Sequence, residues 1–366
     1  MINYLYIDDD AVQKSKDKVS GFVTPELEIN ATQHQGDWES QLEYIRTSIK
    51  NIDGLLLDLG LNDLPNEQQK RANFRGTALA QEIRTRQKEG LLKNIPIILF
   101  SAHDKLESLL ESTGSDLFDM CIDKETVNPD VFDDYSRQFI ALANGYVSVE
   151  SKDIKNILGN YPDDIDTRFF CQLESLANHP PHVTVGFILN ELIKSEGILI
   201  DESTLAARLG IDISKSTEWD IVKSKLTTCL YTGILCEGWP RWWMSKVKTW
   251  WNEHISEEPL RTIGAHQRVA LLKEKLGIEN LVAATRIDKA QSEDFWTICQ
   301  GHKRPIDTID GLIIIGQDNL YPWQEPKYVS IDAALKRTHL DDWKGVATSE
   351  IMYLDKLKQK YSKHRE

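Results

Sequence analysis

The chain has 366 residues, of which 41% are hydrophobic and 27% are charged, and its formal net charge is −14. This length predicts two or three domains, and this composition is ordinary for a soluble globular protein. The acidic total argues against broad, non-specific binding of nucleic acid, although it does not exclude a local basic face. No apolar run approaches the roughly 20 residues of a membrane span, and the start of the chain lacks a signal-peptide pattern. The five cysteines are scattered, so we expect reduced thiols, no membrane partner and a cytoplasmic location.

The first 145 residues alternate short apolar runs with segments of helical periodicity. A short apolar run bounded by turn residues is typical of a strand that is buried on both faces of a parallel sheet. Five alternations of strand and helix predict a doubly wound parallel sheet with right-handed crossovers. The predicted strands are 4–7, 27–32, 52–60, 96–100 and 120–122, and the predicted helices are 11–20, 38–49, 77–87, 105–112 and 131–143.

Polar side chains follow four of these strands at the point where each strand ends. Asp8 and Asp9 follow the first strand, and Asp58 stands at the end of the third. Ser101 follows the fourth strand and Lys124 follows the fifth. The carboxyl ends of parallel strands meet at one edge of the sheet, where ligands of open α/β sheets bind. We therefore expect these side chains to share one site.

Residues 1–145 resemble the receiver domain of two-component response regulators. The positions that match the family's motif are the acidic pair Asp8 and Asp9, the phosphoacceptor Asp58, the hydroxyl residue Ser101, the lysine Lys124 and the glycine Gly76 that opens the third helix. The resemblance implies a flavodoxin-like, five-stranded sheet of order 2-1-3-4-5. It also implies a histidine kinase or a phosphotransfer protein as the partner that delivers a phosphoryl group to Asp58, and a homodimer as a common assembly.

Magnesium is the cofactor that the resemblance implies. A phosphoryl group passes to an aspartate where its negative charge is offset, and Mg²⁺ prefers carboxylate, carbonyl and water oxygens. Asp8, Asp9 and Asp58 would supply carboxylates to the ion, and Gly60 would supply its backbone carbonyl. Without a cation, three such close carboxylates repel one another, and at least one is driven toward protonation.

Lys124 and Ser101 complete the chemistry that the resemblance implies. Lys124 would pair with one phosphoryl oxygen, and Ser101 would donate a hydrogen bond to another. The alternative is a degenerate receiver that keeps the fold and serves as a scaffold without phosphorylation.

Three features depart from the family's pattern. Glu125 stands where the family usually has proline, and Cys121 stands where it often has the aromatic residue whose rotamer reports phosphorylation. Phe118 is a candidate to replace that aromatic residue. The loop over residues 62–74 is longer than usual after the phosphoacceptor. It is either a solvated insertion or a lid or docking loop, since long loops are often functional.

Residues 146–181 read as a linker with short helices over 152–158 and 169–176. Residues 182–254 resemble a winged helix-turn-helix, with Trp219–Tyr231 in the recognition position. The charges of that helix are Asp220, Lys223 and Lys225, with Arg208 nearby. This is a thin set for reading DNA, which needs several phosphate contacts and base-reading side chains. Winged helices also dock proteins, so both outputs stay open.

Five tryptophans within thirteen residues form the most unusual composition in the chain: Trp239, Trp242, Trp243, Trp250 and Trp251. Tryptophan buries a large area, so one interpretation is a core or domain-interface stripe. The other is a protein-partner hot spot or a stacking platform.

Residues 255–366 predict an α+β output domain that matches no family motif. Helical patterns cover 260–284, 294–299, 331–337 and 350–361, and the apolar run 309–315 predicts a strand that pairs with 328–330. Cys299 and His302 have zinc-ligand spacing, but two ligands fall short of the four that zinc requires. The sequence therefore supports a phosphorylation switch with an output in transcription or in protein docking and assembly, and an effector enzyme without a signature stays open.

Overall fold

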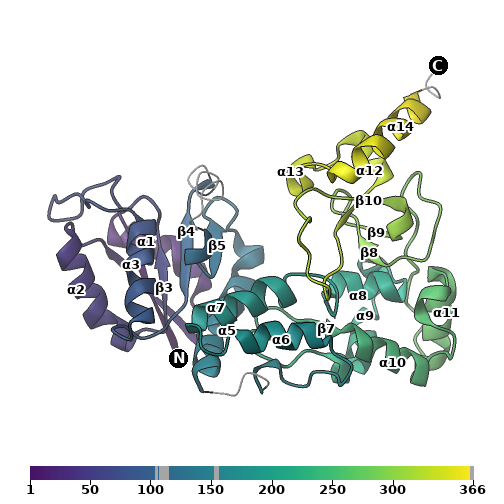
Figure 1. The fold of residues 1–366 in the computed structure, drawn as a ribbon, viewed down its shortest axis with the longest axis horizontal. Helices are drawn as coiled ribbons and strands as arrows, with labels where there is room; N and C mark the ends of the chain where they lie inside the picture. The colour runs from purple at the N-terminus through teal and green to yellow at the C-terminus, as the bar shows by residue number, and fades with distance from the viewer. Residues whose placement is uncertain (104–105, 107–114, 152–155, 363–366) are drawn as a thin grey trace. The chain divides into compact units, whose positions relative to one another are not determined.

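The computed structural model describes residues 1–103, 106, 115–151 and 156–362, which form two compact units (Figure 1). The first unit comprises 1–159, 171–189 and 233–239, and the second comprises 160–170, 190–232 and 240–366. The chain enters each unit more than once, whereas the sequence suggested four consecutive segments. Those four domain boundaries stay predictions.

A five-stranded parallel sheet forms the centre of the first unit (Figure 1). Its spatial order is β2-β1-β3-β4-β5, which confirms the flavodoxin-like, doubly wound α/β fold. The strands all follow apolar runs that the sequence marked: β1 (Ile2–Asp8), β2 (Leu27–Gln33), β3 (Gly54–Leu57), β4 (Ile97–Ser101) and β5 (Met120–Asp123).

Side-chain alternation along β1 explains why both faces of this sheet are apolar. Leu5 and Ile7 pack in a cluster with residues of two helices, whereas Tyr4 contacts the ring of Phe139 on the opposite face. The α-helices described within residues 1–151 are α1 (Val12–Val19), α2 (Trp38–Ser48), α3 (Gly76–Lys88) and α5 (Phe132–Ser151). The last helix continues eight residues beyond the predicted end at 143, and the predicted helix over 105–112 lies outside the described residues, except for the buried Leu106.

A buried ion pair braces the sheet at the end opposite the acidic residues. Arg84 of α3 donates to Asp119, which lies just before β5, with 2.7 Å between the Nη2 and Oδ2 atoms. The hydroxyl of Tyr146, on α5, donates to the other oxygen of Asp119 at 2.6 Å. The backbone N–H of Ile97 also donates to this carboxylate, at 2.7 Å. One carboxylate thus joins α3, β4, β5 and α5.

Later segments of the chain pack directly on α5. Helix α7 (Pro181–Phe187) contacts α5, and the intervening helix is α6 (Thr167–Ser175). Gly145 of α5 lies so close to Leu235 that a Cβ atom at this glycine would be 2.9 Å from the leucine side chain. Of the predicted helix over 152–158, the described part is a single turn, Asn156–Leu158.

The second unit contains helices and three two-stranded sheets with very short strands. A helix of π type spans Ile188–Ile193, and the division between the two units falls within it. The remaining elements are β6 (Leu199–Ile200), α8 (Glu202–Leu209), α9 (Trp219–Lys225), β7 (Trp242–Trp243), α10 (Met244–His254), α11 (Ala265–Leu276), β8 (Thr297–Ile298), β9 (Pro305–Ile306), β10 (Gly311–Ile313), β11 (Tyr328–Ser330), α12 (Ile331–Lys336), α13 (Leu340–Trp343) and α14 (Ile351–Ser362).

Several predictions in this unit need correction. Helix α9 ends at Lys225 and not at Tyr231, and a tight turn follows it. The segment 294–299 contains strand β8 and not a helix, because Thr297 and Ile298 pair with β9. Helix α11 stops at Leu276, where Gly277 adopts the left-handed conformation that ends many helices. The antiparallel pair of β10 with β11 is confirmed.

All five clustered tryptophans are buried, with relative exposures between 0% and 8%. Trp242, Trp250 and Trp251 belong to an apolar cluster of the second unit, together with residues of α8, α9 and α11. The proposed role of an exposed docking or stacking platform is therefore wrong. These side chains form core because their large apolar area is removed from water.

The winged-helix interpretation gains no support. Arg208, which was expected to lie near a recognition helix, is buried and paired with Glu325 at 2.7 Å. Lys223 pairs with Glu202 and Asp220, both at 2.9 Å. Two of the three cations in that region thus already form ion pairs with carboxylates of this chain. Across the described part of the chain, no helix combines the length and the apolar character that a membrane span requires.

Candidate functional site

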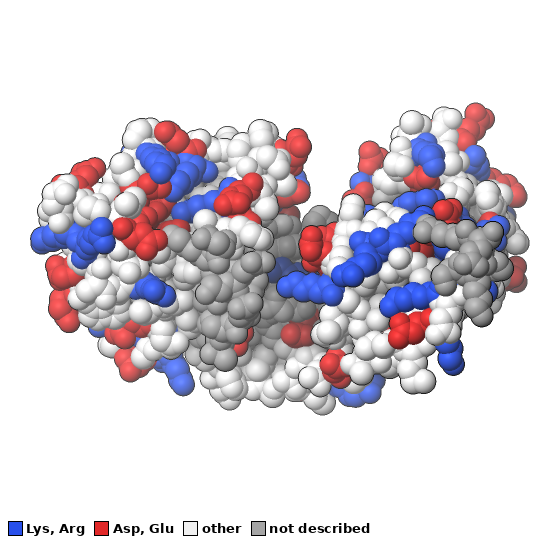
Figure 2. Space-filling model, turned by 90° about the horizontal axis from the view of Figure 1, so that it is seen from above, with Lys and Arg blue, Asp and Glu red and all other residues white. Residues whose placement is uncertain are grey.

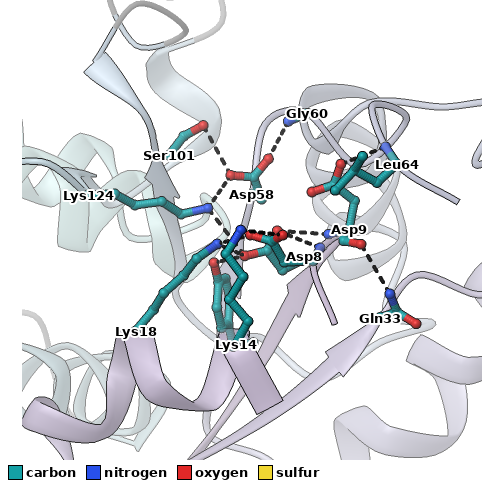
Figure 3. A network of polar contacts seen from close by, with 12 residues as sticks. Asp8, Asp9, Lys14, Lys18, Gln33, Asp58, Gly60, Leu64, Ser101 and Lys124 are labelled. Atoms are coloured by element: carbon teal, nitrogen blue, oxygen red, sulfur yellow. Dashed lines mark hydrogen bonds and ion pairs between the residues drawn. The ribbon is translucent and has the colours of Figure 1, made fainter. Parts of the chain in front are cut away.

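Four strand ends bring the predicted polar residues together at one edge of the first unit (Figure 3). Asp8 ends β1 and Ser101 ends β4, whereas Asp58 and Lys124 directly follow β3 and β5. Asp58 has a relative exposure of 3%, so its carboxylate depends on protein groups for its hydrogen bonds. The strand order places β1, β3 and β4 side by side, and this explains the convergence.

Asp58 contacts two of the side chains that were expected to share one site with it. The Lys124 ammonium lies 2.5 Å from the Asp58 Oδ1 atom, and the Ser101 hydroxyl donates to the same oxygen at 3.2 Å. The backbone N–H of Gly60 donates to the Oδ2 atom at 2.6 Å. A carboxylate held in this way has a fixed orientation beside a cation and a hydroxyl.

Gly76 stands where the first turn of α3 passes the backbone of Asp58. A Cβ atom at this position would lie 2.2 Å from the Asp58 carbonyl oxygen. The close approach explains the glycine, and the N–H of Gly76 also donates to the carbonyl of Leu59 at 3.0 Å. Any larger residue would push the acidic site and α3 apart.

Asp8, Asp9 and Asp58 offer carboxylate oxygens that all lie within 4.8 Å of one another. Among the residues that the structure describes, they are the one group of His, Cys, Asp or Glu side chains close enough to hold a metal ion. Burial, together with the negative charges of Asp8 and Asp58, raises the pKa of Asp9 to about 7. Crowded carboxylates of this kind fit a hard divalent cation such as Mg²⁺, whose charge removes the repulsion.

Gly60 has a different role in the structure from the ligand role that the resemblance implies. Its carbonyl oxygen accepts the backbone N–H of Asp63 at 3.0 Å. A carbonyl oxygen has two lone pairs, so one stays free for another partner. The role of Gly60 as a metal ligand stays a prediction.

Asp8 lies at the centre of the network. Burial acts to raise the pKa of the Asp8 carboxyl, but Lys124, the Tyr6 hydroxyl and Lys18 outweigh it and hold this pKa below its ordinary value. The Oδ2 atom accepts from the Tyr6 hydroxyl, from Lys18 at 2.9 Å and from Lys124 at 3.3 Å, and the Oδ1 atom accepts the backbone N–H groups of Asp9 at 2.8 Å and Asp10 at 3.3 Å.

Tyr6 and Lys18 belong to the site but were not predicted from the sequence. Tyr6 stands two residues before Asp8 on the same strand, so its side chain lies on the same face. Lys18 lies on α1 and its side chain reaches back toward the start of the helix, as helical side chains do. The period of two along β1 was a signal for Tyr6, whereas Lys18 had none beyond a lysine-rich helix.

The aromatic switch that the family often carries is absent from its usual place. Cys121 is exposed, and Phe118 is buried before the start of β5, at the opposite end of the sheet from Asp58. Phe118 therefore does not replace the missing residue. The aromatic rings beside Lys124 are those of Phe100 and Tyr6, with centroids 5.4 Å and 5.7 Å from its ammonium.

The long loop after Asp58 is folded against the acidic site. The backbone N–H of Leu64 donates to the Asp9 Oδ2 atom at 2.8 Å. The Leu64 carbonyl lies 3.1 Å from the Nε2 atom of His34, and the Asn66 side chain donates to the His34 carbonyl at 3.0 Å. The end of the loop buries Phe74 against Trp38. Residues 62–74 are therefore not a purely solvated insertion, because they contact Asp9, His34 and Trp38.

Comparisons with known proteins give little further information. No protein-family model and no curated protein matches the chain. Among solved structures, the response regulator LqsR of Legionella pneumophila matches 62% of this chain and 75% of its own, at 13% sequence identity and a TM-score of 0.28. A likeness this weak does not establish a shared fold or function.

Proposed function

We propose that this protein is a receiver-like signalling switch that accepts a phosphoryl group on Asp58. The observation that carries the proposal is the contact of one buried carboxylate with both Lys124 and Ser101, beside the carboxylates of Asp8 and Asp9. Four predicted strands supply these five side chains at their ends or from the residue that follows, and Asp8 and Asp9 share the first strand. Neighbouring strands of a single sheet thus deliver the acceptor, the cation, the hydroxyl and the acids.

In the proposed reaction, an oxygen of Asp58 attacks the phosphorus atom of the donor. The bond between phosphorus and the leaving group breaks, and an acyl phosphate forms on the aspartate. Lys124 stays beside the new negative charge, and Ser101 donates to a phosphoryl oxygen. Asp8, Asp9 and Asp58 would hold Mg²⁺, with the Gly60 carbonyl as a further ligand, and the ion would offset the charge of the incoming group.

A histidine kinase or a phosphotransfer protein is the proposed donor. We propose that the remainder of the chain transmits the change to a partner, either DNA or another protein. Internal pairing of Arg208 and Lys223 weakens the case for DNA contact through the region around α9. On the face drawn in Figure 2, basic and acidic side chains lie next to one another over the first unit.

Phosphotransfer from acetyl phosphate to the full chain tests the proposal. The protein is incubated with Mg²⁺, and its intact mass is measured over time. We expect one added phosphoryl group in the wild type and none in Asp58→Asn. Asp53→Asn is a matched control, because Asp53 lies just before β3, at the other end of the same strand, and pairs with Lys93 at 3.0 Å. Equal phosphorylation of Asp58→Asn and the wild type would overturn the assignment.

Metal binding is tested separately with Asp9→Ala and Asp10→Ala. We expect loss of Mg²⁺ binding in the first variant and retention in the second. The reverse result would show that the ligand set is wrong.

A further inference from the structure

Two lysines on α1 stand one helical turn apart and contact the acidic cluster differently (Figure 3). The Lys14 ammonium lies 2.8 Å from the Asp10 Oδ1 atom, and its side chain is 66% exposed. The Lys18 ammonium pairs with Asp10 as well, but it also lies 2.9 Å from the Asp8 Oδ2 atom, and its side chain is 24% exposed. Lys18 thus reaches a carboxylate of the candidate metal site, whereas Lys14 pairs outside it.

The donors around the Asp8 carboxylate outnumber its acceptor positions. An ionised carboxylate offers about four lone-pair sites. Asp8 accepts from five donors, of which two are backbone N–H groups and one is the hydroxyl of Tyr6. A cation that binds to Asp8 must therefore compete with these donors, two of which, Lys18 and Lys124, are themselves cations.

Lys18 is the donor that can leave with the least disturbance. The two backbone groups belong to the turn that follows β1, and Lys124 is also tied to Asp58. Lys18 has a second carboxylate, Asp10, which accepts it without Asp8. Release from Asp8 would thus leave the Lys18 charge paired.

We propose that Lys18 is an internal counter-cation of the acidic site, which neutralises Asp8 when no divalent ion is bound and moves to Asp10 when one binds. The proposal rests on the proposed function, because it assumes that Asp8, Asp9 and Asp58 bind a divalent ion. Its consequence is that the site binds the ion more weakly than its carboxylates alone would allow. Lys18 thereby sets the ion concentration at which the site is loaded.

The affinity of the full chain for Mn²⁺ tests this role, with free Mn²⁺ measured by electron paramagnetic resonance. Lys18→Gln removes the competing ammonium, and Lys14→Gln removes an equal charge from the same helix. A hydrogen bond to a charged group contributes at least about 1.5 kcal/mol, which corresponds to a factor of about ten or slightly more. We expect Lys18→Gln to bind Mn²⁺ about tenfold more tightly than the wild type and Lys14→Gln to stay within about twofold.

Thermal unfolding gives a second readout that does not depend on the Mn²⁺ titration. Without divalent ions, Lys18→Gln should unfold at a lower temperature than Lys14→Gln, because Asp8 has lost its counter-ion. Millimolar Mg²⁺ should remove this difference, since an ion that binds the folded state stabilises it. A difference that persists in Mg²⁺ would mean that Lys18 has a structural role alone, and the proposal would be wrong.

The outcomes separate this inference from the function on which it rests. If the wild type binds Mn²⁺, Asp9→Ala does not, and both lysine variants match the wild type, the counter-cation role fails and the metal site stands. If neither the wild type nor Lys18→Gln binds Mn²⁺, both proposals fail. Binding by Lys18→Gln alone would support the counter-cation role in its strongest form.

Discussion

Lowering the pH is expected to weaken the binding of divalent ions, because a proton and the ion compete for Asp9. Burial and the charges of Asp8 and Asp58 raise the pKa of Asp9 to about 7. Its carboxyl is then about one-tenth ionised at pH 6 and about nine-tenths ionised at pH 8. Since the ion binds the carboxylate form, the apparent dissociation constant at pH 6 should be about ten times that at pH 8.

The assay is a titration of the full chain with Mn²⁺ between pH 5.5 and pH 8.5. In the wild type and in the Asp53→Asn control, the affinity should rise with pH and level off above the pKa of Asp9. Asp9→Asn has no proton to lose at this position, so its residual binding should lose this tenfold dependence. A wild-type dissociation constant that changes less than twofold between pH 6 and pH 8 would refute the reasoning.

Three further predictions concern stability. Asp119→Asn removes the counter-charge of the buried Arg84 guanidinium. The free energy of unfolding of the first unit should fall by about 3–5 kcal/mol, because an uncompensated buried charge is strongly destabilising. Hydrogen exchange of the backbone amides of β4 and α5 measures this loss. Asp53→Asn is again the control, and an equal loss in both variants would contradict the prediction. Burial, aided by Asp201, raises the pKa of Glu196 from 4.5 to about 7, so the stability that its protonated form contributes is lost as the pH rises between these values. At pH 8, the free energy of unfolding of Glu196→Gln should therefore exceed that of the wild type by at most about 3 kcal/mol, and at pH 5 the excess should be smaller. Urea unfolding at both pH values measures the excess. An equal excess at both would exclude the titration of Glu196. Trp251→Ala should lower the free energy of unfolding by about 3–5 kcal/mol, because it leaves a cavity in the core. The variant should therefore unfold at a lower temperature than the wild type. A loss of less than about 1 kcal/mol would contradict the core position of Trp251.

The first unit could be predicted from the sequence because each of its strands is a continuous apolar run. Residues such as Leu55 and Leu57 are buried on one face and Leu56 on the other, so the run itself marks the strand. Once the strands are placed, the parallel topology puts their carboxyl ends together, and Asp58 meets Lys124 without further information. The pairing of Lys18 with Asp8 could not be predicted, because helical periodicity does not show which lysine of α1 reaches the carboxylate.

The second unit was less predictable for a physical reason. Its strands are two or three residues long, as in β6, β8 and β10, and so are too short to show a period of two. Thr297 is strand because of its pairing with Ile306, which comes later in the chain. The burial of the five clustered tryptophans could not be predicted, because composition does not show which face of a segment packs against the rest of the protein.

The packing of α7 and Leu235 on α5 shows where the first unit can and cannot be divided from the rest of the chain. A fragment that stops at residue 145 would cut α5 before Tyr146, whose hydroxyl reaches Asp119, and would expose the surfaces that α7 and Leu235 cover. The first unit is therefore not a module that can be excised at this residue and joined to a different domain. Evolution of this protein would have to change α5 and the segments that pack on it together, because replacing the chain after this helix would remove part of the unit's own core.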